Sequence, residues 1–307
     1  AFRRIVRRNF AVQVWSKIDF DTGKVIFLDA TRKEDMNFPE NERLAFRIVE
    51  FLISQHFVVD YEGDFYNVVE WLDMCSGLEK VQILPSKYDE GLLYCGNAWD
   101  YSVSKSELSS RLSTELVHFL FAWGALESLI KSIVPKKQIA SHGKVNALCG
   151  FLKERNLVNL LPDGYLCEYE HLITLLRECV GYERILSDLK METQIKFSYK
   201  SYVDVSGIGA YVVSQIRNNF VHGQMRFPEP EEYSGEQSFN VELIHTATRI
   251  TLMTILLLLI GEIKDNDFIL EDTPDDGMDY SALVYLRNLC SYHSDIISGQ
   301  MNMTDTI

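Results

Sequence analysis

One stretch of the sequence constrains the fold more than any other, because its apolar residues recur with helical spacing from residue 104 to residue 134. Ser104 and Glu107 have the spacing of a capping box at a helix start, and Pro135 cannot continue a helix. A single helix with so long an apolar stripe must pack against other helices to bury it. The stripe consists of Leu108, Leu112, Leu116, Phe119, Leu120, Trp123, Leu126, Ile130 and Ile133.

Four later segments have comparable amphipathic or apolar patterns, over residues 142–155, 165–180, 205–221 and 239–263. No strand pattern interrupts them, so we predict a helical bundle over residues 104–265. The fold class that follows is mainly α, with the bundle preceded by a small α+β domain.

The first 103 residues have a mixed pattern. Runs rich in β-forming residues at 10–20 and 24–29 surround the turn Asp21–Lys24, which predicts a β-hairpin. Helical spacing follows at 41–55 and 64–75, and short strands are predicted at 81–84 and 92–95. We therefore expect an α+β domain over residues 1–103 that recognises a substrate or senses a trigger.

Acidic residues concentrate late in the chain, at 229–236 and again at 262–279. Such runs are typical of solvated loops. We predict that residues 266–307 form an acidic linker followed by a C-terminal helical tail.

The net charge of −14 excludes a protein that coats nucleic acid through a broad basic surface. It leaves room for a nuclease with a local basic cleft, because basic residues cluster at 3–8 and at 131–155.

The six cysteines contain no CxxC pair, which favours buried free thiols and a reducing environment. The apolar run 250–260 is shorter than the roughly 20 residues of a membrane span. No signal peptide is recognisable, so we expect a cytoplasmic protein that does not enter a membrane.

The sequence contains no HExxH, P-loop, GxSxG or GxGxxG motif, and we predict neither a metal nor a cofactor. Among the seven histidines, His118 and His245 lie beside apolar helix faces, where a histidine is usually a satisfied structural group. His222 differs because it ends a predicted helix and Gly223 follows it, in the position where a left-handed residue closes a helix.

Arg217 lies five residues before His222, which places the two side chains about 140° apart around a regular helix. They act on one substrate only if the last turn loosens or if a second subunit completes the site. Their chemistry suits metal-independent RNA cleavage, in which the 2′-hydroxyl attacks the adjacent phosphorus. Histidine serves as the general base or acid, and the guanidinium stabilises the phosphorane charge.

The segment Ile216-Arg217-Asn218-Asn219-Phe220-Val221-His222-Gly223 resembles the motif of HEPN domains, which has an Arg, a polar residue and then a His. The helix around Phe119–Leu129 is similar to the long first helix of the Apea-like HEPN group. The resemblance covers about residues 105–265. It implies a homodimeric, helical RNA-binding hydrolase with facing motifs, namely an endoribonuclease of toxin, antiviral defence or abortive-infection systems. It also implies an RNA substrate such as tRNA or mRNA and an inhibitory or regulatory partner.

Two further residues are candidates for this site. Glu127 lies on or beside the apolar face, where a carboxylate needs a partner, and Arg217 is available. The resemblance implies that such an acidic residue can be catalytic, whereas the alternative is a purely structural ion pair; Glu115 is a weaker candidate of the same kind. Asn218 could bind phosphate or cap a neighbouring turn, and we favour phosphate. Asn219 has no counterpart in the family pattern.

Two functional hypotheses follow. In the first, Arg217, His222, Glu127 and Asn218 form the catalytic site of an endoribonuclease. In the second, the domain is a non-catalytic dimerisation or partner-binding module, which the acidic net charge favours. A second match to the loose motif spacing, from Arg287 to His293, is treated as chance because it lies in the predicted tail.

Overall fold

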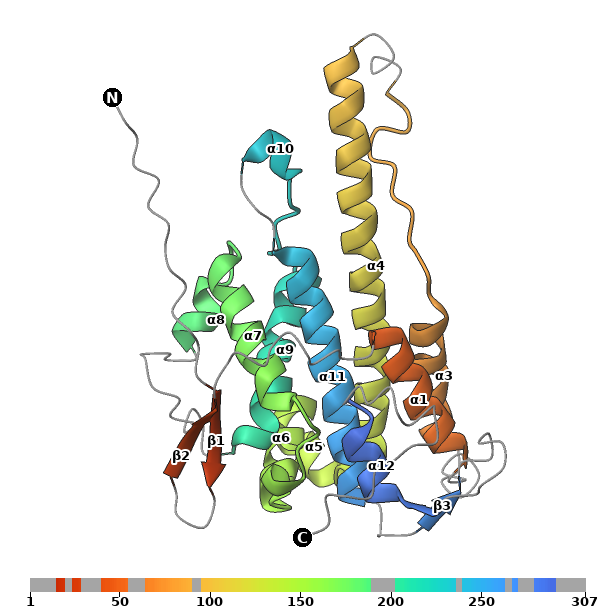
Figure 1. Ribbon diagram of the computed structural model, residues 1–307, viewed down its shortest axis with the longest axis vertical. Coiled ribbons are helices and arrows are strands. Elements are labelled where there is room, and N and C mark those ends of the chain that lie inside the picture. The colour runs from red at the N-terminus through yellow and green to blue at the C-terminus, as the bar shows by residue number, and fades with distance from the viewer. Residues whose placement is uncertain are drawn as a thin grey trace. The chain divides into compact units, whose positions relative to one another are not determined.

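The computed structural model describes residues 15–19, 24–28, 40–54, 64–89, 95–188, 202–235, 239–262, 267–269 and 279–290. The chain divides into one unit of residues 39–290 and a second of residues 1–38 and 291–307. The fold is mainly α-helical (Figure 1). In the second unit, β1 (Trp15–Asp19) pairs antiparallel with β2 (Lys24–Leu28), at the position of the predicted hairpin.

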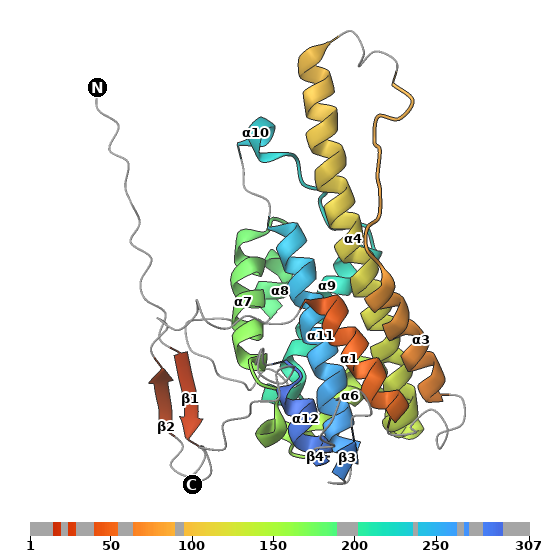
Figure 2. The ribbon, with the colours of Figure 1, turned by 45° about the vertical axis from the view of Figure 1, so that its right-hand side comes forward.

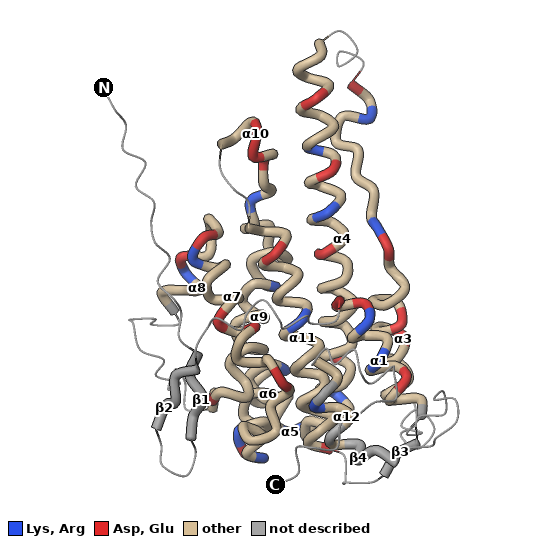
Figure 3. Tube along the Cα trace, viewed as in Figure 1, with Lys and Arg blue, Asp and Glu red and all other residues tan. Residues whose placement is uncertain are grey.

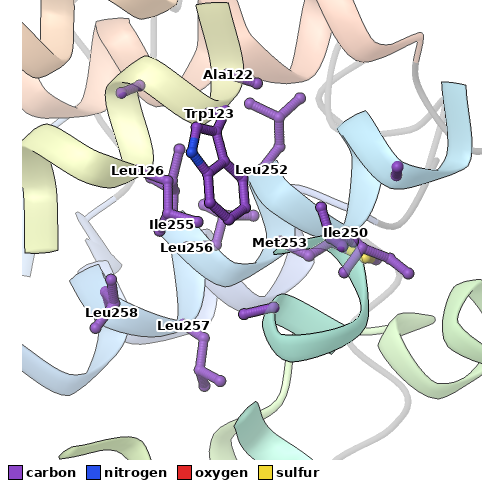
Figure 4. Packing of buried hydrophobic residues seen from close by; sticks show 14 of the residues in the cluster. Ala122, Trp123, Leu126, Ile250, Leu252, Met253, Ile255, Leu256, Leu257 and Leu258 are labelled. Atoms are coloured by element: carbon purple, nitrogen blue, oxygen red, sulfur yellow. The ribbon is translucent and has the colours of Figure 1, made fainter. Parts of the chain in front are cut away.

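Helix α11 (Asn240–Glu262) is the central helix of the larger unit. It packs against α1 (Asn41–Ser54), α4 (Gly96–Ile133), α7 (Tyr165–Glu178), α9 (Val205–Val221) and α12 (Ala282–Asn288). Figure 4 shows its apolar side chains against Ala122, Trp123 and Leu126 of α4. Every residue from Ile250 to Ile260 is buried, as predicted for a core helix. By length and composition both α4 and α11 could cross a membrane, but the apolar window of α11 is 94% buried within the structure and that of α4 is 50% buried.

Three buried threonines on α11 do not leave their hydroxyls unsatisfied. Thr248, Thr251 and Thr254 donate to the carbonyl four residues earlier, at 2.7–2.9 Å. Such local hydrogen bonds remove the cost of burying a hydroxyl. A helix surrounded by other helices can therefore carry these polar groups at its centre.

The remaining elements complete the unit. Helix α3 (Asp64–Gly77) packs on α1 and α4, and α6 (Lys144–Glu154) packs on α9. The shorter elements are α5 (Lys136–His142), the 3-10 helix η3 (Leu157–Leu160), α8 (Glu183–Asp188), α10 (Glu231–Ser234) and the antiparallel pair β3 (Asp267–Ile269) and β4 (Asp279–Ser281).

The predicted α+β domain of residues 1–103 is wrong as a domain. Helices α1 and α3 belong to the helical unit because their apolar residues, among them Ile48 and Leu72, are buried in the same core as α4. A boundary at residue 103 would cut α4, which begins at Gly96, eight residues before the predicted cap at Ser104. Figure 2 shows α1 and α3 beside the lower part of α4.

The predicted strand at 81–84 is not a strand. This extended segment lies along α4, where Val81 N–H donates to Thr114 Oγ1 at 3.0 Å and Ile83 N–H donates to Ser110 Oγ at 2.9 Å. Helix side chains thus satisfy backbone groups that a neighbouring strand would otherwise bind. Of the predicted strand at 92–95, residues 92–94 lie outside the described part, and Cys95 is the N-cap position of α4.

Residues 282–290, which the sequence assigns to an acidic linker and tail, belong to the helical unit. Helix α12 packs on α11, and Leu286, Leu289 and Cys290 are buried there. The prediction missed this because α12 has only seven residues, too few for a clear periodic pattern.

Candidate active site

The candidate motif ends helix α9, as predicted. Asp204 caps the start of the helix by accepting a hydrogen bond from Ser206 N–H at 2.9 Å. At the other end, Gly223 N–H donates to Phe220 O at 3.0 Å and Gln224 N–H donates to Asn219 O at 2.8 Å. Gly223 has φ +67°. These features form a complete Schellman motif, which fixes the backbone on both sides of His222.

The three motif side chains differ in exposure. His222 and Asn218 are exposed, whereas Arg217 is half-buried. Arg217 Nη1 reaches Asn218 Oδ1 at 3.5 Å, at the outer limit of a hydrogen bond, and Arg217 Nε is buried without a hydrogen-bond partner in the described structure. Because His222 stays on the regular cap of α9, the last turn does not loosen to bring it round to Arg217. One chain therefore presents the two groups in different directions.

Glu127 is held by two residues that the sequence did not single out. Trp123 Nε1 donates to Glu127 Oε1 at 2.8 Å, and the Lys144 ammonium donates to Glu127 Oε2. The expected partner, Arg217, acts on Glu127 through its charge, while the ion pair goes to Lys144. The Glu127 carboxylate, on the apolar edge of α4, is therefore paired mainly with Lys144 of α6.

The pKa of the Glu127 carboxyl reflects competing effects. Its partial burial alone would raise the pKa, but hydrogen bonds from Lys144 and Trp123 and the charges of Lys144 and Arg217 lower it below the usual value. Glu127 is therefore ionised at neutral pH, and it is suited to accept hydrogen bonds rather than to donate a proton.

Asn219 has a structural contact instead of a place in the site. Its Nδ2 donates to Gly181 O at 3.1 Å in the turn between α7 and α8. Val180 in that turn is 53% exposed and Val221 is 48% exposed. Apolar side chains thus lie exposed near the polar helix end.

The segment that follows His222 is fastened to α4. Lys105 Nζ pairs with Glu229 Oε1 at 2.7 Å and donates to Pro228 O at 2.8 Å, and the Tyr101 hydroxyl donates to Glu229 Oε2 at 2.6 Å. Tyr101 also makes an edge contact with Tyr233. The acidic run around Glu229 is therefore anchored, in contrast to the freely solvated loop that the sequence predicts.

An acidic pocket of about 660 Å³ lies where this segment meets α4 and the start of α11. Figure 3 shows acidic positions on α10 and on the upper part of α4. Among the described residues of the pocket wall, Arg111 and His245 are the basic side chains. Its acidic lining consists of Glu107, Glu115, Glu229, Glu231, Glu232 and Glu242.

Several other histidines have structural partners. His118 is buried, with Nε2 2.9 Å from Leu78 O, and His245 Nδ1 lies 3.1 Å from Glu115 Oε2. Both agree with the satisfied histidines that the sequence predicted. His171 Nε2 lies 2.9 Å from Glu242 Oε1, a partner that the sequence did not indicate. Glu115, the weaker candidate for the site, contacts His245, and no hydrogen bond or ion pair joins it to Arg217 among the described residues.

In the second match to the motif, Arg287–His293, the arginine lies within the described residues and the histidine does not. Arg287 lies on α12, which packs within the helical unit, so our reason for dismissing the match, its place outside the bundle, is wrong. His293 lies outside the described residues. Within the described part of the chain, no group of three or more His, Cys, Asp or Glu side chains is arranged to hold a metal ion.

Comparison with protein-family models, with curated proteins and with solved structures finds no match for this chain. Its membership of the HEPN family is therefore a proposal that depends on the motif and its surroundings. Of the residues missed, Trp123 could have been found from its i, i+4 spacing to Glu127. Lys144 carries no such signal, because it follows Glu127 by 17 residues and reaches it only through the packing of α6 near α4.

Proposed function

We propose that this protein is an HEPN-type endoribonuclease that cleaves RNA without a metal, with tRNA or mRNA as substrate, and that it acts in the cytoplasm as a toxin or antiphage effector. The observation that carries the proposal is the end of α9. An exposed histidine and, five residues before it, an arginine with no ion pair in the described structure stand at a helix end that is closed by a Schellman motif.

The proposed reaction uses these groups in defined roles. His222 of one copy removes the proton from the 2′-hydroxyl, and the 2′-oxygen attacks phosphorus while the bond to the 5′-oxygen breaks. His222 of a second copy gives a proton to the leaving 5′-oxygen. Arg217 stabilises the negative charge of the phosphorane, and Asn218 hydrogen-bonds the phosphate. A homodimer is needed because one chain supplies one such histidine.

Incubation with total RNA in EDTA tests this function. The unsubstituted protein should cleave, and His222→Ala should lower the rate at least about 100-fold, the usual contribution of a general acid or base. His142→Ala is a matched control, because His142 is also exposed and ends another helix, α5. Cleavage that requires added metal, or that persists in His222→Ala, contradicts the proposal.

A non-catalytic partner-binding module is the second candidate, and the acidic pocket favours it. Six glutamates in one pocket wall repel a phosphate backbone and attract a basic partner. A regulatory partner that binds there is compatible with either function. Under this second candidate the purified protein leaves RNA intact, and His222→Ala does not alter its behaviour.

A further inference from the structure

Each carboxylate oxygen of Glu127 already accepts a hydrogen bond from a neighbouring side chain. Oε1 accepts the indole N–H of Trp123, and Oε2 accepts the ammonium of Lys144. Trp123 is only 6% exposed and is packed among side chains of α4 and α11 (Figure 4). The indole is thus a fixed donor, and Lys144 decides where the other oxygen points.

Arg217 is close enough for its charge to act on Glu127. Even so, no ion pair involving Arg217 is present among the described residues, and its Nε has no hydrogen-bond partner there. An arginine normally binds a nearby carboxylate through two parallel N–H groups. Here Glu127 is instead bound by Trp123 and by the Lys144 ammonium.

We propose that Lys144 is a positioning residue that occupies Glu127 and thereby leaves the Arg217 guanidinium free to bind an RNA phosphate. This inference rests on the proposed function, because it concerns the same site. The phosphate needs the fork of N–H groups that a carboxylate would otherwise fill. Lys144 sets the availability of Arg217 without touching the substrate itself.

Removing the lysine charge tests the idea. In Lys144→Met, Glu127 Oε2 loses its cation and should turn to Arg217. Binding of a fluorescein-labelled 2′-O-methyl oligoribonucleotide, which cannot be cleaved at its 2′-position, is followed by anisotropy. We expect affinity to fall about tenfold, the effect of one lost charge-assisted contact. Lys144→Arg should retain affinity, because arginine can replace the cation at Glu127.

A double variant separates this role from direct RNA binding. Lys144→Met/Glu127→Gln removes the competing negative charge, so affinity should return to within about twofold of the unsubstituted protein if the loss acts through Glu127. Lys136→Met removes one exposed positive charge from α5 and controls for the general loss of charge. Thermal melts confirm that each variant is folded; Lys144 has a 35% exposed side chain, which favours tolerance of the change.

The outcomes separate the two proposals. Unchanged affinity in Lys144→Met, a double variant as weak as the single one, or no oligonucleotide binding by the unsubstituted protein overturns the positioning role. If the predicted order of affinities holds but all-ribose RNA is never cleaved, the proposed function fails and the role of Lys144 stands. If RNA is cleaved through His222 while Lys144→Met binds normally, only the positioning role fails.

Discussion

Asn219 and Gly181 are joined by a hydrogen bond of 3.1 Å from the Asn219 side-chain amide to the Gly181 carbonyl oxygen. This contact connects the last turn of α9 to the turn between α7 and α8. The two adjacent asparagines, Asn218 and Asn219, therefore have different roles. Asn218 is exposed and faces Arg217, whereas Asn219 binds another element of the fold.

Substitution of these two asparagines should affect different properties. Asn219→Ala should lower the free energy of unfolding by about 1 kcal/mol, since it removes one partly buried hydrogen bond. Asn218→Ala should change stability by less than about 0.5 kcal/mol, as for other exposed positions, and should weaken RNA cleavage. Urea titrations measure the difference; equal destabilisation by both substitutions would contradict it.

The anchoring of the segment after His222 should depend on pH. Hydrogen bonds from Lys105 and Tyr101 and the charge of Lys105 lower the pKa of Glu229 below its usual value. A carboxyl whose pKa is lower in the folded state contributes stability that is present above its unfolded pKa. That contribution is lost as the pH falls through the folded pKa. Because Glu229 is half-exposed, the effect should be local and not an unfolding of the bundle.

Amide hydrogen exchange of residues 225–235 checks this dependence. At pH 6 the unsubstituted protein should exchange more slowly there than Lys105→Met does. The difference should shrink as the pH falls below about 4, where glutamates become protonated. Comparing the two proteins at each pH cancels the intrinsic pH dependence of exchange. A difference that does not vary with pH would show that Glu229 is not the anchor.

Helix α9 depends on a glycine for its close approach to its neighbours. A Cβ on Gly209 would lie 2.8 Å from Ile250 Cγ2 and nearer still to the Tyr165 hydroxyl. Gly209→Ala should therefore destabilise the protein by about 1–3 kcal/mol through overpacking. Gly150 on α6 has open space at the same position, so Gly150→Ala should stabilise by about 0.5–1 kcal/mol. Thermal melts that rank the two variants in the opposite order would refute this packing.

The cysteines should differ sharply in reactivity. Burial raises the pKa of the Cys75, Cys179 and Cys290 thiols to about 12, whereas Cys95 is exposed. A thiol-specific reagent at pH 8 should label Cys95 first and Cys75, Cys179 and Cys290 only after unfolding, because the thiolate is the reactive form. Mass spectrometry of timed samples identifies the sites. Cys95→Ser should remove the first labelled site, and rapid labelling of Cys75 in the folded protein would be inconsistent with its burial.

The helices that carry the site could be predicted from local patterns in the sequence. The periodic apolar residues of α4, α9 and α11 and the glycine after His222 were sufficient, because helical spacing and cap residues are local properties of the chain. The mainly α fold and the left-handed Gly223 follow from them.

Which residues come into contact depends on how the helices pack against one another. Helices α1 and α3 pack into the bundle, and residues 81–83 lie along α4 where a strand was expected. Glu127 forms its ion pair with Lys144, not with the expected Arg217. Each of these contacts depends on how two helices approach each other, and distant pairs such as Lys144 and Glu127 leave no periodic trace in the sequence. The end of α9 could be predicted because its hydrogen bonds are local, whereas the electrostatic surroundings of Arg217 are set by side chains from α4 and α6 that only folding brings near.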